Sequence, residues 1–69
     1  MEEQSFKPSW FRVVLGFYSQ VSKKWVITDS SPWTTEAKAR ADQSQWGYGS
    51  WLQYQDQHGN PIDVKGSYR

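Results

Sequence analysis

The clearest structural signal in this 69-residue sequence is the stretch Trp10-Phe11-Arg12-Val13-Val14-Leu15-Gly16-Phe17-Tyr18. Its odd-numbered positions are all apolar, and a period of two is typical of a strand with one buried face. We therefore expect Phe11, Val13, Leu15 and Phe17 to face a hydrophobic core. The opposite face of the strand is mixed and aromatic, and it presents Trp10, Arg12, Val14, Gly16 and Tyr18.

A second strand is predicted over residues 24–29, after a hairpin loop at residues 19–23. The segment is rich in β-branched and aromatic residues, which favour strands. We expect Trp25 and Ile27 to point inward and Val26 and Thr28 to lie on the outer face. Pro32 then ends the strand, because proline cannot continue a hydrogen-bonded ladder.

A helix is predicted from Thr34-Thr35-Glu36 to just before Gly47. A threonine N-cap accepts backbone N–H bonds, and a glutamate in the first turn complements the helix dipole. Glycine is a natural residue at the end of a helix. We expect Ala37 and Ala41, four residues apart, to face the sheet, and Trp33 to cover the entry end as a hydrophobic staple.

Two more strands are predicted after the helix, over residues 50–56 and 62–64, with a turn at residues 57–61. In the longer strand, Leu52 and Tyr54 are expected to point inward and Trp51, Gln53 and Gln55 outward. The fold class is therefore α+β, with the order β-β-α-β-β and one helix packed on one face of a small antiparallel sheet. We interpret residues 1–69 as a single domain, with residues 1–8 and 66–69 as flexible tails.

The composition limits how such a domain can be stabilised. The sequence has no cysteine and one histidine, His58, so disulfides and thiolate zinc sites are excluded and a metal site is not expected. A chain this short gains only about 3–5 kcal/mol from one core, although its five Trp, four Tyr and three Phe bury much area per residue. We therefore expect self-association, with a homodimer as the simplest form.

Charge and hydropathy narrow the class of partner. The net charge is +1, whereas duplex-binding modules usually carry a clear basic excess. No apolar run approaches the length of a membrane span, and Met1-Glu2-Glu3-Gln4 does not resemble a signal peptide. We expect a cytoplasmic protein without a membrane partner and without a cofactor.

No arrangement of residues points to catalysis. His58 stands in a turn-forming sequence, and Asp29, Asp42, Asp56 and Asp63 fall at predicted strand ends, on the helix or beside turns, where aspartate ordinarily caps or breaks. A nucleophilic serine would need a nearby base, and His58 is the only imidazole. We expect no enzyme and no catalytic residue.

The sheet face away from the helix is unusually aromatic for a face that water should cover. A patch of this kind indicates a binding surface. Three ligands are open: a protein partner or second copy, single-stranded nucleic acid stacked on the rings, and a glycan. A strand shifted by one residue would instead turn its rings inward.

The stretch Gln45-Trp46-Gly47-Tyr48-Gly49-Ser50-Trp51 alternates glycines with large rings. It is either a helix-to-strand connector whose rings cover the open end of the core, or a contact loop, because Trp and Tyr dominate binding hot spots.

The sequence therefore predicts a non-enzymatic protein-interaction module of the kind that phages, plasmids or gene cassettes encode as adaptors or inhibitors. The predicted binding residues are Trp10, Arg12, Tyr18, Trp46, Tyr48, Trp51 and Gln53. The alternative function is a single-stranded nucleic-acid-binding protein that uses the same face.

Overall fold

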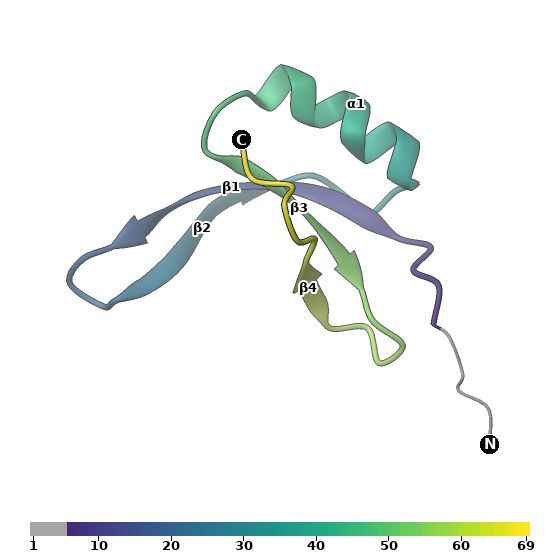
Figure 1. Ribbon diagram of the computed structural model, residues 1–69, viewed down its shortest axis with the longest axis horizontal. Helices are drawn as coiled ribbons and strands as arrows, with labels where there is room; N and C mark the ends of the chain where they lie inside the picture. Colours follow the sequence, from purple (N-terminus) through teal and green to yellow (C-terminus); the bar gives the residue numbers. More distant parts are fainter. Residues whose placement is uncertain (1–5) are drawn as a thin grey trace.

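A computed structural model describes residues 6–69 and contains one antiparallel sheet and one helix. The order along the chain is β1 (Phe11–Ser19), β2 (Lys24–Ser30), α1 (Glu36–Trp46), β3 (Ser50–Gln55) and β4 (Pro61–Asp63). The four strands lie in the order β2-β1-β3-β4, and every neighbouring pair is antiparallel (Figure 1). The predicted α+β fold class is confirmed.

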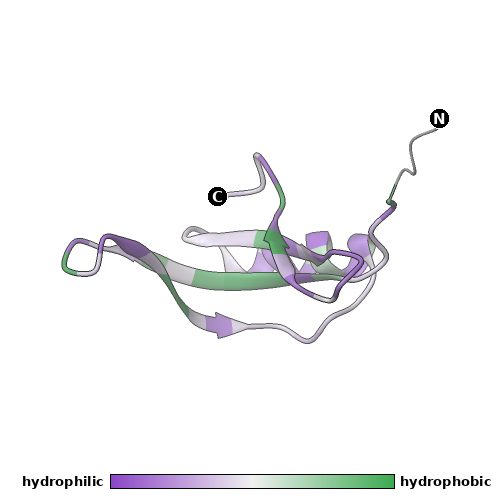
Figure 2. Cartoon of the chain, turned by 90° about the horizontal axis from the view of Figure 1, so that it is seen from below, coloured by the Kyte–Doolittle hydropathy of each residue, from purple (hydrophilic) through white to green (hydrophobic). Residues whose placement is uncertain are grey.

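The hydrophobic core lies between α1 and the middle of the sheet. Phe11, Val13 and Leu52 from β1 and β3 pack with Ala39 of α1, and the half-buried side chains of Trp46, Tyr54 and Val64 surround them. Figure 2 shows the most hydrophobic stretch of the chain in the middle of the sheet. The inward orientation predicted for Phe11, Val13, Leu52 and Tyr54 is confirmed.

The far end of β1 does not reach this core. Phe17 is 52% exposed, because the β1–β2 hairpin continues beyond the end of the helix that covers the rest of the sheet (Figure 1). A period-two pattern identifies the face of a strand but not how far the covering layer extends along it.

The predicted orientation of β2 is wrong. Trp25 lies opposite Tyr18 and Ile27 opposite Gly16, so both share the sheet face of Val14, away from the helix. Val26 pairs with Phe17 on the other face. Both faces of β2 carry apolar residues, so hydrophobicity alone could not fix its phase.

A bulge separates this hairpin from the rest of the ladder. Leu15 lies opposite Asp29 and Gly16 opposite Ile27, which leaves Thr28 as the extra residue. The two strands come so close here that a Cβ on Gly16 would stand 2.1 Å from the carbonyl oxygen of Val26. Only glycine fits at this position.

The helix has the predicted ends but a different buried stripe. Thr35 is the N-cap, its hydroxyl accepts the N–H of Lys38 at 3.2 Å, and Gly47 ends the helix with φ 77°. The buried residues are Ala39 and Gln43, whereas Ala37 and Ala41 are exposed. The amide of Gln43 determines this stripe, because it donates to the carbonyl oxygens of Ser50 at 3.2 Å and Ser67 at 2.7 Å.

The C-terminal residues, predicted as a tail, run alongside β3. The N–H of Arg69 donates to the carbonyl of Ser50 at 2.9 Å, and the N–H of Gly49 donates to the carbonyl of Arg69 at 2.8 Å. The Ser67 hydroxyl accepts the N–H of Leu52 at 2.9 Å. These bonds hold residues 66–69 against the sheet, while residues 1–5 of the predicted N-terminal tail lie outside the described residues. Within residues 6–69, no helix combines the length and hydropathy needed to cross a membrane.

Candidate interaction surface

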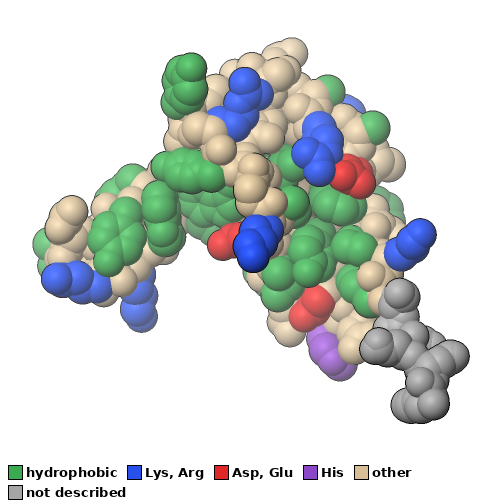
Figure 3. Space-filling model, in the orientation of Figure 1, with side chains coloured by type: hydrophobic (Ala, Val, Ile, Leu, Met, Phe, Trp, Pro, Cys, Tyr) green, Lys and Arg blue, Asp and Glu red, His purple; other side chains and the backbone are tan. Residues whose placement is uncertain are grey.

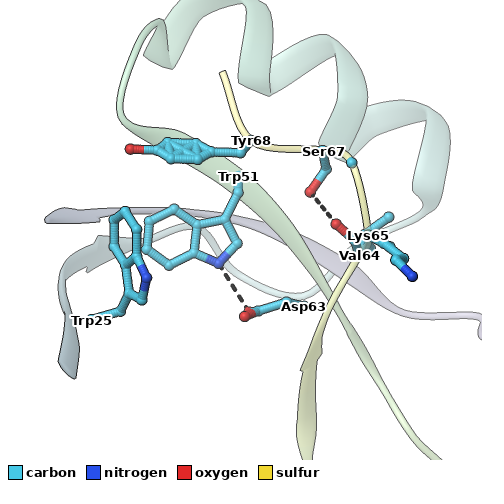
Figure 4. Close-up of a pocket in the computed structure, with 8 residues that line it drawn as sticks. Trp25, Trp51, Asp63, Val64, Lys65, Ser67 and Tyr68 are labelled. Atoms are coloured by element: carbon cyan, nitrogen blue, oxygen red, sulfur yellow. Dashed lines mark hydrogen bonds between the residues drawn. The ribbon is translucent and has the colours of Figure 1, made fainter. Parts of the chain in front are cut away.

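Four aromatic side chains gather on the sheet face opposite the helix, and we call them the aromatic cluster: Tyr18, Trp25, Trp51 and Tyr68. Trp25 lies at the centre, with its ring centroid 5.7 Å from that of Tyr18 and 5.4 Å from those of Trp51 and Tyr68. All three contacts are edge-to-face, a favoured geometry for aromatic rings. The rings come from β1, β2, β3 and the C-terminal segment, so parts distant in the sequence form one surface. Figure 4 shows three of them, Trp25, Trp51 and Tyr68.

Trp51 is the most buried ring of the aromatic cluster. Its side chain is 7% exposed, and its indole Nε1–H donates to Asp63 Oδ1 at 2.9 Å (Figure 4). The same carboxylate oxygen accepts the amide of Gln53 at 2.9 Å. One acidic residue of β4 therefore orients two neighbouring side chains of β3.

A polar row continues from Gln53 across the sheet. Arg12 donates to Gln53 Oε1 from Nε at 3.1 Å and from a terminal nitrogen at 2.9 Å. Its guanidinium lies 4.5 Å from the ring centroid of Trp33, a cation–π distance. Trp33 thus packs with Arg12, a contact that the expected helix staple does not include.

A pocket of about 240 Å³ opens beside the cluster, between the rings of Trp25 and Trp51 and residues 63–68 (Figure 4). Its walls are aromatic, and Asp63, Lys65 and Ser67 contribute the polar groups. This combination of apolar walls and a few polar groups is typical of ligand sites, although the volume suits a single side chain rather than a cofactor.

Exposed apolar side chains extend from the cluster along the β1–β2 hairpin. Trp25 is 51% exposed, Tyr18 43%, Ile27 43% and Val26 36%. The space-filling view shows hydrophobic side chains over the β1–β2 hairpin, with basic side chains at its end (Figure 3). Neighbouring exposed side chains of this kind often mark an interaction site.

The structure brings four of the seven predicted binding residues onto the open face: Arg12, Tyr18, Trp51 and Gln53. Trp51 and Gln53 are buried at 7% and 6% exposure, so they support the surface rather than present it. Tyr18 remains accessible.

The other three predicted residues lie elsewhere. Trp46 packs against the core on the helix side, as expected if its ring covers the open end of the core. Tyr48 projects from the loop between α1 and β3 and is 90% exposed. Trp10 is 51% exposed just before β1, where its backbone carbonyl accepts the N–H of Gln55.

Three residues of this surface, Trp25, Tyr68 and Asp63, are not identified by the sequence pattern. The pattern places Trp25 in the core, because the predicted phase of β2 is wrong. Tyr68 falls in the predicted tail, although an aromatic residue between Ser67 and Arg69 is a signal that this segment packs against something. Asp63 lies in the short predicted strand over residues 62–64, and nothing in the neighbouring sequence indicates a role on this surface.

Residues 6–69 hold no group of three His, Cys, Asp or Glu side chains placed to bind a metal ion. The pKa of Asp56 is lowered chiefly because the backbone N–H of Asn60 donates to its carboxylate, with a further N–H from His58. The two backbone bonds to this carboxylate hold the β3–β4 turn in place. The His58 side chain is exposed in the same turn.

In comparisons of the chain with protein-family models, with curated proteins and with solved structures, no match was found.

Proposed function

We propose that this chain is a non-enzymatic protein-interaction module that binds a segment of another protein on the aromatic cluster and its pocket. The observation that supports this proposal most directly is that the Trp25 and Tyr68 rings are both exposed and held in a fixed orientation. Each ring is 51% exposed, yet ring contacts with each other and with the buried Trp51 hold both in place. Rings that are fixed before binding lose little entropy when a partner covers them.

The chemistry of the pocket indicates what the partner segment presents. An apolar side chain fills the pocket between the two tryptophan rings on one side and residues 63–68 on the other, and a hydrogen-bond donor reaches Asp63. Asp63 Oδ1 already accepts two bonds within the chain, whereas the second oxygen of the carboxylate offers further lone pairs to a partner.

We also propose a cytoplasmic location, with which a sequence free of cysteine is compatible.

A displayed library of random peptides, selected on the immobilised protein, tests this function and does not require the natural partner to be identified. We expect enrichment of peptides that combine an apolar residue with a donor. Their affinity falls at least about tenfold on Trp25→Ala, as for a hot-spot ring. Tyr48→Ala removes an even more accessible ring outside the aromatic cluster and is the control. No enrichment, or an equal loss on the two variants, would contradict the proposal.

The nucleic-acid alternative is tested by titrating the protein with a single-stranded oligonucleotide at low and moderate salt. Bases that stack on exposed rings quench tryptophan emission, and the binding is strongly salt-dependent. Quenching that Trp25→Ala abolishes would favour the alternative over the protein-interaction module.

A further inference from the structure

We propose that β2 pairs edge to edge with β2 of a second copy of the chain, so that two four-stranded sheets join into one. This inference goes beyond the proposed function, because it uses the backbone edge of the sheet rather than the aromatic cluster on its face.

The two edges of the sheet differ in how they are protected. β4 has three residues and begins with Pro61, and short length and proline both discourage further pairing. β2 has seven residues, every one of them exposed, and contains neither proline nor glycine. No other strand formed by residues 6–69 lies on its outer side. β2 is therefore the edge whose free N–H and C=O groups invite a further strand.

The side chains next to this edge also lack cover. Trp25 and Ile27 on the open face are 51% and 43% exposed, and Val26 on the other face is 36% exposed. A two-stranded ribbon that projects from its domain is only marginally stable in water. A further strand on β2 would bury part of each of these three side chains.

The charges of β2 favour a second copy of the same strand over an unrelated peptide. Lys24 begins β2, Lys23 immediately precedes it in the turn, and Asp29 lies near the end of β2, roughly 16 Å from Lys24 along an extended strand. Antiparallel pairing aligns the start of each copy with the end of the other. Centred on Val26, it brings the Lys23–Lys24 end of each copy close to Asp29 of the other, and it places Trp25 opposite Ile27 on the open face.

This pairing has a consequence for the binding surface. A two-fold axis that joins two edge strands antiparallel in one sheet stands perpendicular to that sheet, so both open faces point the same way. The two aromatic clusters would then lie side by side, with the Trp25 rings near the axis. The dimer would present a bivalent surface.

The first test compares two substitutions of valine in the same hairpin. Val26→Lys puts two lysines directly opposite each other at the centre of the pairing, where Cβ atoms approach within about 5 Å. Val21→Lys, at the exposed hairpin turn, is the matched control. By light scattering across concentrations, we expect the wild type and Val21→Lys to reach twice the 8.1 kDa chain mass. Val26→Lys should raise the dimer dissociation constant at least about tenfold. A wild type that stays monomeric, or a Val26→Lys variant that dimerises equally well, would overturn the proposal.

The second test reverses the charges at the two ends of β2. Lys23→Asp/Lys24→Asp and Asp29→Lys should each weaken self-association, because like charges then meet at both ends. Aspartate tolerates the positive φ of 59° at position 23. An equimolar mixture of the two variants should form a heterodimer. Lys7→Asp/Lys38→Asp, with the same change in net charge away from β2 and from the pocket, should leave dimerisation intact. Failure of the mixture to associate would contradict the antiparallel arrangement, whatever the peptide selection shows about the aromatic cluster.

Discussion

Asp63 holds the aromatic cluster in place through one carboxylate oxygen. Trp51 and Gln53, which donate to it, are 7% and 6% exposed, so neither donor has ready access to water. The rigidity of Trp51 therefore depends on a residue of β4, the shortest strand of the sheet.

Replacing Asp63 should lower the free energy of unfolding, and the decrease should be larger when both of its hydrogen bonds are lost. Asp63→Ala leaves two buried donors without their acceptor, and we expect the free energy of unfolding to fall by about 2 kcal/mol. Asp63→Asn keeps a carbonyl oxygen at the same place and should lose less. Urea denaturation followed by tryptophan fluorescence measures both. Equal losses in the two variants would show that the hydrogen bonds contribute nothing.

Asp56 gives the β3–β4 turn a defined pH dependence. Its folded pKa lies below the ordinary value of 3.8, chiefly because the N–H of Asn60 donates to the charged form. The stability that it contributes is thus present above about pH 4 and is lost as the pH falls through the folded pKa. We expect the difference in unfolding free energy between the wild type and Asp56→Ala to shrink from about pH 5 to about pH 2. A difference that stays constant over this range would argue against the role of the charge.

Among the elements, the β1–β2 hairpin depends on a single glycine. The Cβ of Gly16→Ala would stand 2.1 Å from the carbonyl oxygen of Val26, so the backbones of the two strands must separate. We expect loss of the Trp25–Trp51 contact while the core around Val13 and Leu52 persists. Near-ultraviolet circular dichroism reports the contact between the two rings, and far-ultraviolet circular dichroism reports the sheet and helix. An unchanged near-ultraviolet spectrum would contradict this account of the bulge.

The C-terminal segment is the element that closes the aromatic cluster. Tyr68 lies 5.8 Å from Trp51 between ring centroids, and the backbone bonds of Arg69 hold it there. Tyr68→Ala should admit water to Trp51 and shift tryptophan emission to longer wavelength. Tyr48→Ala, at a ring that is 90% exposed, should leave the emission unchanged. If the two variants behave alike, Tyr68 does not cover Trp51.

The elements differ in how well the sequence predicts them. β1 is predictable because four apolar residues alternate with a mixed face, and the helix ends are predictable from the Thr35 cap and Gly47. The phase of β2 is not, because Trp25-Val26-Ile27 is apolar on both faces and a bulge interrupts its register. The buried stripe of α1 escapes prediction because the short alanines give a weak pattern and the deciding residue, Gln43, is polar.

At the scale of the whole molecule, the sheet is covered in two different ways. The helix covers one face over Phe11, Val13 and Leu52, whereas the other face is covered in part by its own rings and by the C-terminal segment. The sequence indicates an aromatic open face, but only three-dimensional pairing adds Trp25 and Tyr68 to it. The candidate site therefore depends on contacts between segments far apart in the chain.

The central claim is that a partner binds on the aromatic cluster. Its most direct test is a ¹H–¹⁵N NMR titration of the labelled protein with a peptide selected from the random library. We predict the largest shift changes at the indole N–H groups of Trp25 and Trp51 and at the amides of residues 63–68, with the Trp46 indole unchanged. Changes concentrated at Trp46 and on α1, with Trp25 and Trp51 unaffected, would contradict the claim.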